Sequence, residues 1–234
     1  MKPYQRIPIQ ECGEPLVALS ADVFSLVEPH PYAVLGAPYG GKSPFFVRQS
    51  VCDRLLQAQQ QLQRTHPDWR IQVFDAYRPI AVQQFMVDHT FAQLVREKGL
   101  DARQLTADQR AAIYELVLEF WAIPSADPAT PPPHSTGAAI DVTFANATGL
   151  PVDMGSPVDE VSPRSYPDHF ANCTDAAAKQ YHQCRILLRR VMTEAGFTQH
   201  PNEWWHFSFG DQMWAWCIQQ AGKGATIARY GAIG

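Results

Sequence analysis

Five prolines lie between residues 124 and 133, and this run constrains the fold more than any other feature of the sequence. Proline lacks a backbone N–H and fixes φ, so the stretch can form neither a helix nor an interior strand. The apolar residues 138–144 follow directly, with an acid, Asp141, at their centre. We predict a stiff loop leading into a strand, with Asp141 on one face and Ile140 and Val142 on the other.

Hydrophobic periodicity predicts several further elements. Apolar residues recurring every three or four positions favour helices over residues 46–63, 80–98, 106–121 and 174–195. Alternating β-branched or aromatic segments favour strands at residues 71–75, 138–144 and 203–207. Thr106 and Gln109 form a capping box, Thr174 is placed to cap the last helix, and residues 32–41 read as a loop. Since no linker composition interrupts the chain, we expect one domain spanning residues 1–234.

Composition and charge exclude several classes of function. The chain has 46% hydrophobic and 18% charged residues, which is typical of a folded globular protein. Its formal charge of −4 offers no basic surface for nucleic acid or an anionic membrane. There is no run of about 18 apolar residues and no apolar signal core at the start, so we expect a cytoplasmic protein. The five scattered cysteines form no metal or redox motif, and the sequence does not define an oligomeric state.

Three polar residues in otherwise apolar surroundings suggest a metal site. His134, Asp141 and His206 would supply two imidazoles and one carboxylate, leaving a fourth position for water, as in catalytic zinc sites. Gly137 lets the chain turn, so that a residue before the strand and one inside it converge on one ion. Taken alone, any one of these histidines is more readily an ordinary hydrogen-bonded side chain, and the other histidines, His30 and His200 among them, lack a motif and are expected to be ordinary.

Two more charged residues would complete a hydrolytic site. Glu203, three residues before His206, is placed to accept a proton from a metal-bound water. Arg78, fixed at a strand end by Pro79, could stabilise the oxyanion of a tetrahedral intermediate. The simpler alternative for Arg78 is an ion pair with Asp75.

Other classes of protein use similar residues. Non-haem iron oxygenases also bind metal through two histidines and one carboxylate, but usually separate the first His and the acid by one residue. Here six residues intervene, and Glu203 would have no role. A binding module that had lost catalysis would lack the base or the arginine, and both are present.

Three ordered motifs resemble one known family. They are Asp75-Ala76-Tyr77-Arg78-Pro79, His134-Ser135-Thr136-Gly137-Ala138-Ala139-Ile140-Asp141 and Glu203-Trp204-Trp205-His206. Together they resemble the D-x-Y-R-P, H-x-x-G-x-A-x-D and E-x-W-H signatures of the zinc D-alanyl-D-alanine dipeptidases of the vancomycin-resistance type. The resemblance implies an α+β fold in which a central, mostly antiparallel sheet carries the zinc and helices flank it.

The same resemblance assigns roles to individual residues. It implies one zinc ion per chain held by His134, Asp141 and His206. Glu203 then activates the metal-bound water, and Arg78 stabilises the transition state.

The resemblance also implies a substrate. Asp159, after a Met-Gly turn, and Tyr32 would bind the amino end of a small D,D-dipeptide, which is hydrolysed to two D-alanines. The family often has Ser two residues before the first zinc ligand, whereas this chain has Pro132. The alternative is a zinc D,D- or L,D-carboxypeptidase acting on peptidoglycan stem peptides.

Overall fold

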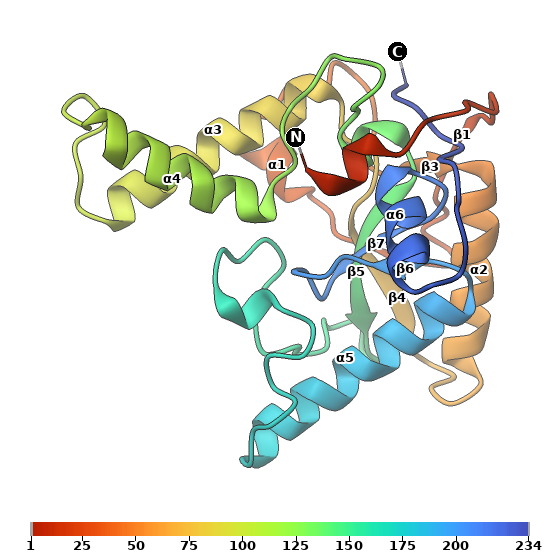
Figure 1. Cartoon of the computed structure of the whole chain (residues 1–234). Coiled ribbons are helices and arrows are strands. Elements are labelled where there is room, and N and C mark those ends of the chain that lie inside the picture. Colours follow the sequence, from red (N-terminus) through yellow and green to blue (C-terminus); the bar gives the residue numbers. More distant parts are fainter. Residues whose placement is uncertain (1, 234) are drawn as a thin grey trace.

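A five-stranded sheet forms the centre of the structure, a computed structural model that describes residues 2–233 (Figure 1). Its strands, in spatial order, are β2 (Ser25–Leu26), β4 (Arg70–Asp75), β5 (Ala139–Ala145), β7 (His206–Ser208) and β6 (Thr198–Gln199). Only β2 and β4 run parallel, and the other neighbours are antiparallel. A separate antiparallel pair joins β1 (Leu16–Ala18) and β3 (Phe46–Arg48). The expected α+β class with a mostly antiparallel sheet is confirmed.

Helices surround this sheet. They are α1 (Pro31–Val34), α2 (Gln49–Gln63), α3 (Ile80–Glu97), α4 (Ala107–Phe120), α5 (Ala176–Glu194) and α6 (Gln212–Gln220), with short 3-10 helices at Pro3–Arg6, Pro133–Thr136 and Pro163–Ser165. Leu55 of α2 and Leu188 of α5 share the main apolar core with Ile140 and Val142 of β5. α3 and α4 form a projecting hairpin with its own apolar cluster (Figure 1). Among residues 2–233, no helix is long and apolar enough to cross a membrane.

The sheet register aligns three polar residues in one row. Asp141 of β5 lies opposite Asp75 of β4 on one side and opposite His206 of β7 on the other. A register shift between Val73 and Asp75 brings Asp75 into this row. Since successive side chains on a strand alternate between faces, Ile140 and Val142 enter the core while Asp141 points away from it. This confirms the expected orientation of Asp141.

Several predicted boundaries are wrong. Residues 46–48 form β3 rather than the first turn of a helix, because they pair with β1. Residues 203–205 lie outside the strand, with a bend at 204–205, so the last predicted strand begins only at His206. The helix expected from Thr174 is capped instead by Asp175, whose side chain accepts a hydrogen bond from the Ala178 amide. The predicted loop over residues 32–41 overlaps α1, whose first residue is proline.

The segment after Gly210 packs back onto the opposite end of the chain. α6 lies against the 3-10 helix Pro3–Arg6, and the side-chain amide of Gln212 donates through Nε2 to the Ile7 carbonyl at 2.6 Å. Tyr230 is fully buried in the main core. Residues 3–7 and residues 212–230 therefore pack together beside the sheet.

Candidate active site

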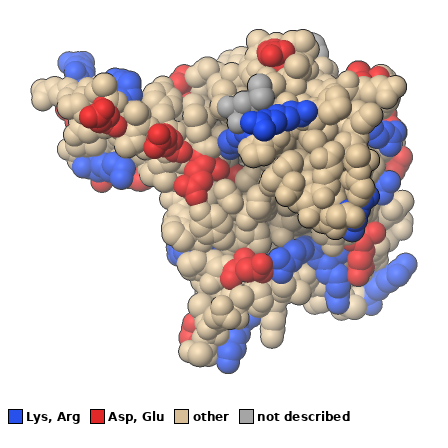
Figure 2. All heavy atoms as spheres, viewed as in Figure 1, with Lys and Arg blue, Asp and Glu red and all other residues tan. Residues whose placement is uncertain are grey.

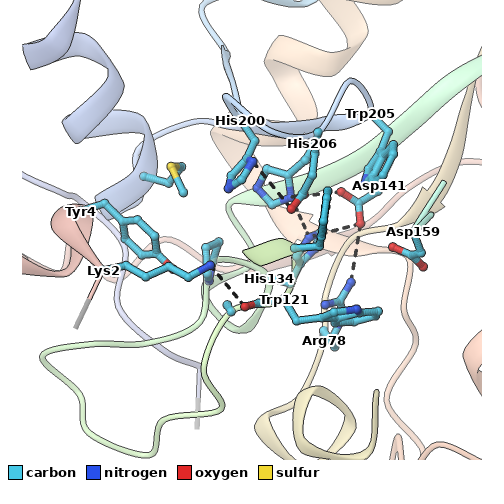
Figure 3. A pocket seen from close by; sticks show the side chains of 15 residues that line it. Lys2, Tyr4, Arg78, Trp121, His134, Asp141, Asp159, His200, Trp205 and His206 are labelled. Atoms are coloured by element: carbon cyan, nitrogen blue, oxygen red, sulfur yellow. Dashed lines mark hydrogen bonds and ion pairs between the residues drawn. The ribbon is translucent and has the colours of Figure 1, made fainter. Parts of the chain in front are cut away.

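Three side chains converge at the end of the polar row (Figure 3). His134 Nε2 lies 3.3 Å from Asp141 Oδ2, and His206 Nδ1 lies 3.1 Å from Asp141 Oδ1. The two ring nitrogens are 3.2 Å apart. All three residues are buried, and one potential ligand atom from each lies within 4.8 Å of the others. We call this group the metal triad (His134, Asp141 and His206), because it could hold a metal ion.

In His134 and His206, one ring nitrogen faces the centre of the triad and the other points away from it. Hydrogen bonds to the nitrogens that point away leave those that face the centre free to bind a metal. His134 Nδ1 lies 2.7 Å from the Ala76 carbonyl, which can only accept, so Nδ1 carries the proton and Nε2 has a free lone pair. The Ser208 hydroxyl donates to Asp211 Oδ2 at 2.9 Å, and it lies 3.3 Å from His206 Nε2. It therefore accepts from that nitrogen, which leaves His206 Nδ1 unprotonated.

Asp141 also fits a metal ligand. In the described part of the chain its Oδ1 is buried without a hydrogen-bond donor of good geometry. Burial raises the pKa of Asp141, but when His134 and His206 are protonated their charges and hydrogen bonds outweigh burial and hold that pKa well below its usual value. A carboxylate that stays ionised beside two free imidazole lone pairs suits a divalent cation such as zinc.

A left-handed turn brings His134 next to Asp141. The 3-10 helix Pro133–Thr136 ends at Gly137, whose φ is +70°. A side chain there would be strained and would also collide with Leu16. The expected role of Gly137 in bringing the two segments together is confirmed.

Glu203 faces the triad from the turn before β7. Its Oε2 lies 3.6 Å from His206 Nδ1, and its Oε1 lies 3.6 Å from His200 Nδ1. Burial and the nearby charge of Asp141 raise the pKa of Glu203 well above its usual value. A carboxylate with a raised pKa, close to a metal triad but outside it, is suited to accept a proton.

Arg78 lies on the other side of the triad in a fixed geometry. It donates to Asp75 Oδ2 at 2.7 Å through Nη2 and to Gln83 Oε1 at 2.8 Å through Nη1. Its Nη2 also lies 3.5 Å from Asp141 Oδ2, and its guanidinium packs against the rings of Tyr32 and Trp121. The ion pair with Asp75 is confirmed, and it directs the guanidinium at the site, whereas the role of Arg78 at an oxyanion stays a prediction.

Asp159 and Tyr32 lie together, as the resemblance implies. The Tyr32 hydroxyl donates to Asp159 Oδ2 at 2.5 Å, and Arg78 Nη2 donates to the same hydroxyl at 3.3 Å. Asp159 has a φ of +64° and is the one non-glycine residue among residues 2–233 with a positive φ. Burial, and after it the charge of Asp141, raises the pKa of Asp159 to about 7.

One cavity contains most of these groups. It is lined by Arg78, Asp159, Glu203 and the metal triad, and also by residues that no motif identified, among them Lys2, Tyr4, Trp121, His200 and Met213. Charged side chains on the outer face are scattered among uncharged ones (Figure 2).

Sequence reasoning missed several members of the site. We expected His30 and His200 to be ordinary histidines, yet His30 Nε2 lies 3.1 Å from Asp75 Oδ1 and His200 contacts Glu203. Lys2 and Met213 come from the two ends of the chain, and their positions depend on the packing of α6 against the first 3-10 helix. For His200, proximity to the E-x-W-H motif was the one available signal.

A buried metal triad with a carboxylate and an arginine beside it places the chain among the metallohydrolases. Comparison with known proteins narrows this class. The family model of the peptidase M15 D-Ala-D-Ala dipeptidases matches residues 25–222, and the chain belongs to this family.

Relatives with known names agree with this assignment. The chain is 50% identical to a D-alanyl-D-alanine dipeptidase of Synechocystis sp. over 240 aligned positions, covering 100% of this chain and 97% of the relative. Dipeptidases of Escherichia coli and Enterococcus faecium are each 40% identical over shorter regions, 32% and 34% of this chain and 36% and 37% of theirs. The solved structure of the LdcB LD-carboxypeptidase covers 94% of this chain and 77% of its own, with a TM-score of 0.47 and 14% identity.

Proposed function

We propose that this chain hydrolyses D-alanyl-D-alanine to two molecules of D-alanine. The proposal treats residues 1–234 as a single catalytic domain with one zinc ion per chain. The observation that carries it is the gathering, in one cavity, of the metal triad, Glu203, Arg78 and Asp159. The full-length similarity to a D-alanyl-D-alanine dipeptidase supports the choice of substrate.

In this proposal His134, Asp141 and His206 hold the zinc ion. When bound, zinc supplies a Lewis acid that polarises the scissile carbonyl and acidifies water at neutral pH. Glu203 removes a proton from the attacking water and delivers it to the leaving amine, for which its raised pKa is suited. Arg78 stabilises the negative charge that develops on the carbonyl oxygen, and Asp75 and Gln83 keep its guanidinium in place.

Asp159 and Tyr32 bind the ammonium group at the amino end of the dipeptide. An ammonium near Asp159 favours the ionised carboxylate, and the short hydrogen bond from Tyr32 orients it. Binding of a free ammonium in a buried site selects against longer peptides, whose chain would continue where the charge is required.

The direct test is D-alanine release by the zinc-loaded wild type and by Glu203→Ala, with the zinc content of each determined. We expect the wild type to release D-alanine, and the variant to retain zinc and lose activity. A pentapeptide ending in D-Ala-D-Ala serves as the comparison substrate. Faster cleavage of the pentapeptide than of the dipeptide would contradict the proposal and favour a carboxypeptidase.

A further inference from the structure

Lys2 reaches the same cavity from the first residues of the chain. The side chain is half-buried, and its Nζ donates to the Trp121 carbonyl at 3.3 Å. Tyr4 and Gln5 are buried and fix the segment, and the Lys2 amide donates to Gln5 Oε1 at 2.9 Å. Lys2 is therefore a positioned part of the cavity wall.

The surroundings of Lys2 leave its charge only partly compensated. One carbonyl oxygen accepts from the ammonium group, which has three donors. Glu203 and Glu119 act on it by longer-range attraction, and neither lies within ion-pair distance. Burial outweighs that attraction and lowers the pKa of Lys2. An anion placed at this end of the cavity would supply the missing partner.

Lys2 and Asp159 lie on opposite sides of the metal triad (Figure 3). Both line the one cavity, so a ligand bound at the triad has a positive group at one end and a negative group at the other. A free dipeptide carries complementary charges, with an ammonium and a carboxylate at its two ends. Two residues span at most about 7 Å, so a small cavity can engage both ends at once.

We propose that the ammonium group of Lys2 binds the terminal carboxylate of the substrate. The inference rests on the proposed dipeptidase function and extends it to the carboxyl end of the substrate. It makes the first 3-10 helix, residues 3–6, a determinant of specificity, because this helix holds Lys2 over the cavity.

The test compares D-alanyl-D-alanine with D-alanyl-D-alaninamide, which lacks the negative charge. Lys2→Met keeps the apolar stem and removes the ammonium group, Lys2→Arg keeps the charge, and Lys179→Met changes an exposed lysine of α5 as the matched control. We expect Lys2→Met to raise KM for the free acid by about tenfold or more and leave KM for the amide unchanged. Lys2→Arg should restore most of the preference for the acid, and Lys179→Met should behave as wild type. Thermal unfolding checks that each variant folds.

Equal effects of Lys2→Met on acid and amide, or no effect on either, would overturn the assignment. Calorimetric measurement of the binding of the acid and of the amide separates failure of the Lys2 assignment from failure of the proposed function. If the zinc-loaded wild type hydrolyses neither compound, the dipeptidase proposal fails. Tighter binding of acid than of amide, lost in Lys2→Met, would still support the role of Lys2, and equal binding would reject it.

Discussion

The metal side of the cavity and its recognition side are built differently. Asp141 and His206 lie in paired strands and occupy opposite positions in the sheet register. Asp159 lies in a loop with a left-handed backbone, and Lys2 lies on the N-terminal segment. The geometry needed by a metal is thus fixed by backbone hydrogen bonds, whereas the groups proposed to bind substrate depend on loop packing. We expect substitutions on the two sides to separate catalysis from affinity.

The largest effect should come from the metal side. Asp141→Asn removes the charge of the carboxylate ligand, so we expect loss of bound zinc and a fall in kcat/KM on the order of 10³-fold or more. Metal analysis and kinetics on the same sample provide the measurement. Asp159→Asn is the matched control, and zinc loss in the control would contradict the division into two sides.

Arg78 lies between the two sides and should affect kcat more than KM. Arg78→Lys loses the paired contacts to Asp75 and Gln83, so we expect kcat to fall on the order of 10²-fold with zinc retained. Arg54→Lys is the control, because Arg54 bonds the Ala195 carbonyl outside the cavity. A rise in KM with kcat unchanged would instead assign Arg78 to binding of the substrate in the ground state.

On the recognition side, Asp159→Asn should change affinity. Asparagine tolerates a positive φ, so the substitution removes the charge without adding backbone strain. We expect KM for D-alanyl-D-alanine to rise about 10- to 100-fold, with a smaller change in kcat. An N-acetylated dipeptide lacks the ammonium, and its hydrolysis should not respond to the substitution. An equal rise in KM for the free and the N-acetylated dipeptide would show that Asp159 does not act on the ammonium group.

A smaller effect on metal affinity is expected from the second contact of His206. Ser208→Ala removes the hydroxyl that lies between Asp211 Oδ2 and His206 Nε2 and contacts both. We expect the loss of this contact to weaken zinc binding by about tenfold. Competition with a chelator measures this directly. Unchanged affinity would show that strand pairing alone orients the imidazole.

The smallest effect concerns pH and the stability of the zinc-free protein. Because the pKa of Asp159 is raised to about 7 in the folded chain, the folded state keeps its proton when the unfolded state has lost it. This contribution is fully present below about pH 4 and is lost as pH rises to about 7. As the pH rises from 4 to 7, the melting temperature of the wild type should therefore fall relative to that of Asp159→Asn. A difference in melting temperature that stays constant with pH would contradict the raised pKa of Asp159.

The two sides also differ in how far the sequence predicts them. The metal triad, Glu203 and Arg78 follow from motif spacing, since each motif lies on or next to a strand of the sheet. Thr106 and Gln109 form the predicted capping box because that interaction is local. Lys2 could not be predicted, because its position depends on packing between the two ends of the chain.

Errors at element boundaries have the same origin. The periodic pattern in residues 46–63 is continuous, yet the first three residues pair with β1, a contact between distant segments that periodicity does not encode. The bend at residues 204–205 likewise places Glu203 before β7 rather than in it. Local signals thus predicted the four long helices and the central strands, but they missed α1, α6 and the short strands β1, β2, β3 and β6. Long-range contacts decided where the elements begin.

The separation of the triad along the chain has a consequence for synthesis. His134 and His206 are 72 residues apart, and the second is supplied by one of the last strands. Under the proposed zinc assignment, a ribosome-bound chain that has not yet released β7 lacks one of the three ligands and the nearby Glu203. Truncated products of translation would then lack a complete site, and zinc capture would be a late step in the maturation of each molecule.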